Sequence, residues 1–400
     1  MRLATKRIAS LTCAAALLLS MSACTGAAAS GSGATTDSSL SANAPDGQPP
    51  EKPDGAPGDG KGGPGGGFGG SGQVTQGTSA NTLDSDTTVF STSYSSTGSD
   101  ENALRVDGAD VTLRDVTVTK SDGKSSNTED GDFYGMNAAL LATNGATLTV
   151  TDSTITSSAQ NGNGVFSYGE GTTVNISDST IRTSADNSGG IQTTGGGTTN
   201  ASDLTVETAG NSSAAIRSDR GGGTVNITGG SYSTSGYNSP AVYSTANISV
   251  SDADLTATNS EALVIEGSNS IALTNCTVSG NMSSTQSTSA DENVHNVMLY
   301  QSMSGDAEVG TSSLSITGGS LTGKSGDLFY ITNTHAIISL SGVTLSNEDA
   351  SASLMTIAGN SSSHGWGTAG RNGAQVEFTA DAQTLNGNIT VDSISTLSFA

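Results

Sequence analysis

Residues 163–183 read NGVFSYGEGTTVNISDSTIRT, and they contain one full unit of the pattern that decides the fold. Val174 and Ile176 flank a single polar residue, as on the inward face of a short β-strand. Asp178 follows, and aspartate tolerates left-handed backbone or closes a turn with its own side chain. Ile181 marks a second strand, and residues 163–168 predict a third strand ahead of both. The unit therefore reads strand, loop, strand, one-residue bend, strand.

The same unit recurs from about residue 100 onward. Most repeats are 23 to 26 residues apart, and only the pair Thr199/Ala201 is weakly apolar at the strand positions. Positions equivalent to Ile181 are Val118, Ile155, Val206, Tyr232, Leu255, Val278, Leu321 and Leu345, and those equivalent to Asp178 are Asp115, Asp152, Asp203, Gly229, Asp252, Asn275, Gly318 and Gly342. No repeat can bury its own apolar face, so neighbouring repeats must stack as the turns of a parallel β-helix.

The composition agrees with a thin, repetitive core. Hydrophobic residues make up 33% of the chain and aromatic residues only 4%, too little to fill the centre of a wide globule. Glycine is abundant at 53 residues. Together with many Ser, Thr, Asn and Asp residues, it makes long helices unfavourable.

Three strands per turn with one left-handed residue between two of them resembles the right-handed β-helix of the pectate-lyase-like superfamily. The resemblance covers roughly residues 100 to 400. It implies an all-β, right-handed parallel β-helix solenoid of about ten coils, and it says little about activity, because one fold hosts many functions. The left-handed hexapeptide β-helix has a shorter turn that does not fit these spacings. An antiparallel sandwich is a further alternative.

The N-terminus has the features of an export and lipidation signal. Arg2, Lys6 and Arg7 precede an apolar run, and Met21-Ser22-Ala23-Cys24 resembles the lipobox of bacterial lipoproteins. We expect residues 1–23 to be a signal peptide and Cys24 to carry lipid, which places the protein at the cell surface on the outer face of a bacterial membrane. An ordinary signal peptide cut nearby is the alternative. Residues 24–80 are rich in Gly, Pro and Ser and predict a disordered tether.

The β-helix is expected over residues 81–400. Strand patterning continues through Ile389, Val391, Ile394 and Leu397 without any cap-like segment. An open last coil leaves strand edges unpaired. The pattern therefore predicts that the domain is truncated at its C-terminus, or that its last coil docks on another chain.

One outward face is the expected ligand site. If Val165, Ile191, Ile216, Val242 and Leu263 point inward, their neighbours place aromatic rings, an arginine and carboxylates outward on the strand that precedes each unit. Long insertions at 121–137, 279–296, 302–312 and 359–374 border this face, and we expect them to form a groove. The ligand-binding candidates are Phe166, Tyr168, Arg217, Asp219, Tyr243, Glu266, His364, Trp366 and Arg371.

Two classes of function fit these residues. A non-catalytic adhesin or glycan-binding protein fits the anchor, the tether and the absence of any legible catalytic set; its partner would be extracellular or cell-wall polysaccharide, or host glycan. A polysaccharide lyase or glycoside hydrolase is the alternative. A lyase needs a base and a cation at the sugar carboxylate, and Arg217 or Arg220, oriented by Asp219, are the candidates.

Other partners are disfavoured. The 37 acidic and 14 basic residues give a net charge of −23, which repels nucleic acid and anionic membranes, so membrane contact is expected through the lipid alone. No cofactor is expected; bound Ca²⁺ is compatible with the acidity, but no Asp-rich calcium loop is legible. Ice binding through threonine ladders is disfavoured, because the outward residues Thr149, Asn175, Asn200, Asn226 and Ser249 are mixed.

Overall fold

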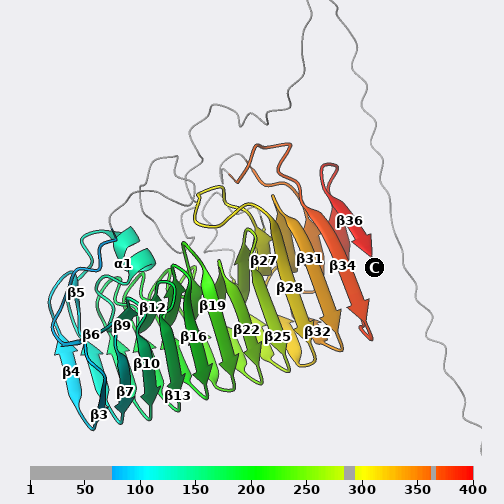
Figure 1. Ribbon diagram of the computed structural model, residues 1–400. Coiled ribbons are helices and arrows are strands. Elements are labelled where there is room, and N and C mark those ends of the chain that lie inside the picture. Colours follow the sequence, from blue (N-terminus) through cyan, green and yellow to red (C-terminus); the bar gives the residue numbers. More distant parts are fainter. Residues whose placement is uncertain (1–73, 283–292, 362–365, 400) are drawn as a thin grey trace, which may run out of the picture. The chain divides into compact units, whose positions relative to one another are not determined.

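Short strands recur three times in most coils of the computed structural model, which describes residues 74–282, 293–361 and 366–399. These residues all belong to one compact unit. Their strands form three long sheets in which every pairing is between neighbouring coils and parallel. The chain is therefore a parallel β-helix, as predicted, and its coils follow one another along a single axis (Figure 1).

Each coil contributes one strand to sheet 1 and one to sheet 2, and all but the last two coils also contribute one to sheet 3. Sheet 1 contains β2 (Thr82–Leu83), β6 (Leu104–Asp107), β9 (Leu140–Thr143), β12 (Val165–Tyr168), β15 (Ile191–Thr194), β18 (Ile216–Ser218), β21 (Val242–Ser244), β24 (Leu263–Glu266), β27 (His295–Tyr300), β30 (Asp327–Thr332), β33 (Met355–Ile357) and β35 (Ile389–Val391). Sheet 2 contains β3 (Thr87–Phe90), β7 (Asp110–Arg114), β10 (Thr147–Thr151), β13 (Thr173–Ser177), β16 (Gly197–Ser202), β19 (Gly223–Thr228), β22 (Asn247–Ser251), β25 (Ser270–Thr274), β28 (Thr311–Thr317), β31 (His335–Ser341), β34 (Gln375–Asp381) and β36 (Thr396–Phe399). Sheet 3 contains β4 (Ser93–Ser96), β8 (Thr117–Lys120), β11 (Thr154–Ser157), β14 (Thr180–Thr183), β17 (Thr205–Thr208), β20 (Ser231–Thr234), β23 (Asp254–Ala257), β26 (Thr277–Gly280), β29 (Ser320–Gly323) and β32 (Thr344–Asn347). A short pair, β1 (Thr78–Ser79) with β5 (Glu101–Asn102), lies at the first coils.

The bend between sheets 2 and 3 has the left-handed backbone that the sequence predicts. All nine predicted positions have a positive φ, from 49° at Asp178 to 67° at Gly229. The column continues to Ser91 and Ala382, with φ of 47° and 49°. Serine and alanine have no preference for this conformation, so at these two positions the stacked coils impose the bend.

The interior is a single apolar column that all three sheets enclose. Val174, Ile176 and Ile181 are buried in it, and each pairs in register with its equivalent in the coils before and after. The weak pair also faces inward: Thr199 is buried, and its hydroxyl lies 2.7 Å from that of Thr193. The polar interior of this coil is thus internally hydrogen-bonded, which removes most of the cost of burial.

The last coil exposes apolar side chains, as its sequence suggests. Val391, Ile394 and Phe399 are all more than a third exposed, and β35 and β36 lie at the ends of sheets 1 and 2. Docking of this coil on another chain stays a prediction. Among the described residues, no helix is long and apolar enough to cross a membrane.

Candidate functional site

The side chains predicted to point outward from sheet 1 do leave the interior of the coil. Phe166 belongs to an apolar cluster with Ala138 and Leu141, and Tyr243 belongs to another with Tyr300 and Trp366. Both clusters are separate from the apolar column inside the coils. The alternation that the sequence indicates along these strands is therefore confirmed.

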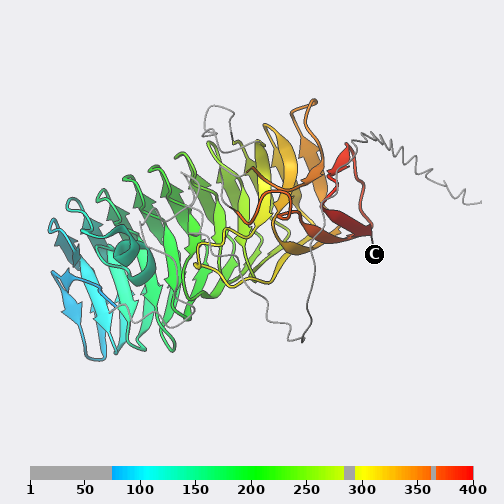
Figure 2. The ribbon, with the colours of Figure 1, turned by 90° about the horizontal axis from the view of Figure 1, so that it is seen from above.

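The expected exposure of this face is wrong. Phe166, Arg217, Asp219, Tyr243 and Glu266 are fully buried, and Trp366 is 4% exposed. The described parts of the insertions at 121–137, 302–312 and 359–374 pack on sheet 1, so the predicted groove is closed at these residues. The helix α1 (Thr128–Tyr134) covers the first part of the face, as Figure 2 shows. Further along, the ring of Trp366 packs 4.8 Å from that of Tyr300. Replacing Tyr243 or Arg217 with alanine would consequently destabilise the fold in addition to any effect on ligand binding.

Helix α1 is short but well defined by its ends. The side chain of Asn127 accepts a hydrogen bond from the backbone N–H of Glu129, and Gly135 ends the helix with left-handed backbone. Gly131 allows close packing, because a Cβ there would lie 2.8 Å from the Cβ of Asn161. Asp132 and Phe133 are thereby turned onto sheet 1 and buried.

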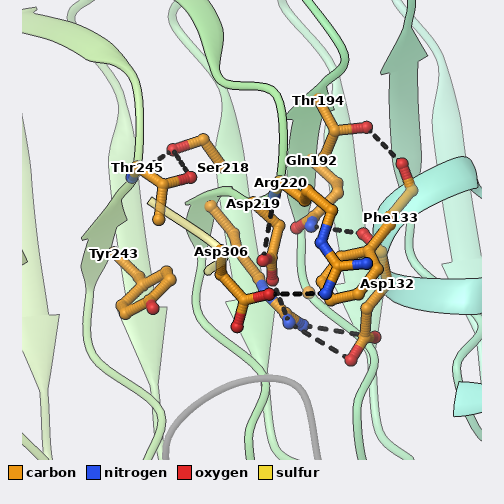
Figure 3. Close-up of polar contacts among 12 residues, drawn as sticks. Asp132, Phe133, Gln192, Thr194, Ser218, Asp219, Arg220, Tyr243, Thr245 and Asp306 are labelled. Carbon is orange, nitrogen blue, oxygen red and sulfur yellow. Dashed lines mark hydrogen bonds and ion pairs between the residues drawn. The ribbon is translucent and has the colours of Figure 1, made fainter. Parts of the chain in front are cut away.

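Arg217 is the centre of a buried ionic cluster beneath α1. Figure 3 labels its two acidic partners, Asp132 and Asp219. Its Nη2 lies 2.7 Å from Asp219 Oδ2 and 3.2 Å from Asp132 Oδ2, and all three side chains are excluded from solvent. Burial by itself lowers the pKa of Arg217, but the charges of Asp132 and Asp219 outweigh it and raise that pKa above its ordinary value. Arg217 is therefore a permanent cation whose charge is neutralised within the protein.

Arg220 joins three parts of the chain at the edge of this cluster. Its Nη2 donates to Asp306 Oδ1 at 2.8 Å, and its guanidinium lies 4.1 Å from the centre of the Phe133 ring. Glu129 is 4.0 Å from its Nη1. Arg220 thus lies between α1 and the loop after β27 (Figure 3), and its own side chain is 39% exposed whereas that of Asp306 is buried.

Glu266 is the acceptor in a second buried cluster. Its carboxylate accepts hydrogen bonds from the hydroxyls of Tyr243, Tyr300 and Ser302, with Tyr300 at 3.0 Å. Burial, and then the charge of Glu266, holds the pKa of Tyr243 and that of Tyr300 well above the usual tyrosine value. Both tyrosines consequently stay protonated and act as donors. These residues form a hydrogen-bonded layer between sheet 1 and the loop after β27.

The sequence did not single out the side chains of sheet 1 that bind α1. Gln192 Nε2 donates to the carbonyl of Asp132 at 3.0 Å, and Thr194 Oγ1 donates to that of Phe133 at 2.6 Å. The signal available was Phe133 and Met136 in an otherwise polar insertion. Two such apolar side chains are more easily explained by packing onto the coil than by exposure.

The remaining candidates have different surroundings. Tyr168 is half-buried, with its ring 5.6 Å from that of Tyr134, and Arg371 is exposed. His364 and the lipidation candidate Cys24 lie outside the described residues. Within the described ranges, no three His, Cys, Asp or Glu side chains are grouped to hold a metal ion.

An open groove lies on sheet 3, where no candidate was expected. It has a volume of about 550 Å³ and follows six successive strands, from β8 to β23. The exposed pair Arg182 and Glu207 lies within it, with Arg182 Nε 2.7 Å from Glu207 Oε2. The other lining residues are mainly hydroxyl-bearing: Thr119, Ser121, Thr156, Ser157, Ser158, Thr183, Ser184, Thr208, Ser233, Thr234, Ser235 and Thr258, with Lys120 and Ala209.

The sequence does not indicate that the residues of this groove form a site. Outward Ser and Thr residues are the ordinary surface of a β-strand, whereas the aromatic rings that indicate a glycan site lie on sheet 1. Comparisons of the chain with protein-family models, with curated proteins and with solved structures find no match.

Proposed function

We propose that this protein is a non-catalytic glycan-binding or adhesive protein, held at the outer face of a bacterial membrane by lipid on Cys24. The sequence supports export and anchoring, through the lipobox-like residues 21–24 and the Gly- and Pro-rich tether that follows them. Its ligand would be an extracellular or cell-wall polysaccharide, or a glycan of a host.

The observation that carries this proposal is the groove on sheet 3. Hydroxyl groups recur at equivalent positions on its strands: Thr119 and Thr156 are neighbours, and Ser233 follows beyond Arg182 and Glu207 in the same row. Such rows offer hydrogen bonds to a ligand that is itself rich in hydroxyls and extended over several coils. The groove is open, whereas the residues of sheet 1 that the sequence predicts for glycan binding are mostly buried.

The geometry gives less support to the lyase alternative. A base must reach the proton that it removes, directly or through one water. Arg217 and Asp219 are fully buried and bound to each other, and Arg220 is held by Asp306. The ion pair of Arg182 and Glu207 also interrupts the hydroxyl rows of sheet 3, which disfavours a uniform ice-binding surface.

The anchor is tested by replacing Cys24 with serine in the producing cells. Serine has no thiol to accept the lipid, so we expect the variant to be released into the medium while the wild-type protein stays with the membrane fraction. Immunoblotting of the two fractions measures the effect. Membrane retention of the variant equal to that of the wild type would refute the anchor.

Binding and cleavage are separated by testing one preparation in two assays. We expect the released, folded protein to bind members of a glycan array and to generate no new reducing ends or unsaturated sugars from the glycans that it binds. Catalytic release of either product would contradict the non-catalytic proposal. An absence of binding to every glycan would contradict glycan recognition itself.

A further inference from the structure

We propose that the groove on sheet 3 binds an uncharged polysaccharide, lying along the axis of the β-helix, and that Arg182 and Glu207 determine its specificity. The inference rests on the proposed glycan-binding function and names the class of ligand and the site. Three independent features of the groove support it: the direction of its hydroxyl hydrogen bonds, its charge and its repeat.

The hydroxyls along one side of the groove already donate their hydrogens within the protein. Ser158 Oγ donates to the carbonyl of Ser121 at 2.8 Å, and Thr258 Oγ1 donates to that of Thr234 at 3.0 Å. Ser235 makes the equivalent bond at 3.4 Å. A hydroxyl has one hydrogen and two lone pairs, so these exposed side chains have acceptor capacity left. A ligand that fits them has to donate hydrogen bonds, as sugar hydroxyls do.

Buried threonines fix the same edge of the sheet. Thr208 Oγ1 and Thr234 Oγ1 each donate at 2.5 Å to a carbonyl five residues later, in the turn that follows sheet 3. Thr183 donates to Ser188 in the same way. The chain that carries the acceptors is therefore held before any ligand arrives, which reduces the entropy lost on binding.

The charge of the groove argues against ionic ligands of either sign. Glu207 is the only acidic residue that lines it and is bound to Arg182, while Lys120 is buried and bonded to Ser96 and Gly98. A polycation finds no unpaired carboxylate in the lining. A polyanion is repelled by a chain of net charge −23. An uncharged glycan meets neither obstacle, and the half-exposed ion pair offers it one strong donor and one strong acceptor.

The repeat sets the orientation of the ligand. Equivalent residues on neighbouring strands are about 4.8 Å apart, which is comparable to the length of one pyranose unit in an extended chain. Six strands therefore present a series of similar contacts over about 24 Å along the axis. No aromatic ring lines the groove, so affinity has to accumulate from many hydrogen bonds. We expect affinity to rise with oligosaccharide length until the groove is filled.

The test uses linear, uncharged gluco-, manno- and galacto-oligosaccharides of increasing length, with oligogalacturonates of matched length as the anionic probe. Calorimetric titration of the released protein should show binding of at least one uncharged series and tighter binding of its longer members. The double variant Arg182→Thr/Glu207→Thr keeps strand-forming residues at both positions. It should bind that series about tenfold more weakly or worse, because hydrogen bonds to charged groups are lost.

Two further variants show whether a loss of binding comes from a change in the groove or from a general loss of folding. Ser158→Glu places a charge in the groove and should also weaken binding, while Asn226→Ala, an exposed change on sheet 2, should leave affinity unchanged. Unchanged affinity in both groove variants, or binding of anionic glycans alone, would overturn this inference and leave the proposed function standing. If the glycan array shows no binding at all, both fail together.

Discussion

Replacing Arg217 with methionine is expected to lower the free energy of unfolding by about 3–5 kcal/mol. Methionine fills much of the same space but leaves Asp132 and Asp219 buried without their cation. The loss should appear in urea unfolding followed by circular dichroism. It should also appear in the fluorescence of Trp366, the only tryptophan, which is buried on the same face of sheet 1.

A triple variant provides the control. Adding Asp132→Asn and Asp219→Asn removes both uncompensated charges, and it should recover a large part of the lost stability. If Arg217→Met alone unfolds at the wild-type urea concentration, the buried cluster does not stabilise the fold. The surface variant Arg182→Met should change stability by less than about 1 kcal/mol, because its ion pair is half-exposed.

Two substitutions of Tyr232 are expected to change the free energy of unfolding in opposite directions. It lies inside the coil between Val206 and Leu255, fully buried, and its hydroxyl has no hydrogen-bond partner among the described residues. Tyr232→Ala opens a cavity and should cost about 3–5 kcal/mol. Tyr232→Phe keeps the ring and removes a buried polar group without a partner. It should stabilise the protein by about 1–3 kcal/mol.

The same urea unfolding experiment measures both variants. Burial raises the pKa of Tyr232, so the hydroxyl is neutral at physiological pH and the comparison is one of hydrogen bonding alone. A phenylalanine variant less stable than the wild type would show that the hydroxyl is bonded in solution, and would contradict the prediction.

The fold could be predicted because its determinants are local and repeated. Asp178 and its equivalents mark the bend, and pairs such as Val174 and Ile176 mark the inward face, at spacings that vary little. Each coil supplies the same information, so an irregular pair such as Thr199 and Ala201 does not obscure the register. Ser91 and Ala382 could not be predicted as bend residues, since only stacking on neighbouring coils gives them left-handed backbone.

The environment of the candidate site could not be predicted in the same way. Alternation places Arg217 outside the coil, but whether it meets solvent depends on where a distant insertion lies. Asp132 is 85 residues away in the chain. No period relates the two, and their contact depends on α1 and its packing at Gly131. The sheet 3 groove could not be predicted for a related reason. It depends on similar weak contacts that recur from coil to coil, and no single residue indicates it.

The contacts of α1 have a mechanical consequence. A solenoid whose coils contact only their neighbours can peel from its end one coil at a time. Here one short helix is bonded through Asp132 to Gln192 and Arg217 on two different coils, and Asp306 holds Arg220 from a loop 86 residues further along the chain. Under tension, the coils without such bonds would yield in small steps. The coils that are linked through α1 and Asp306 would resist as one unit and unfold together at a higher force.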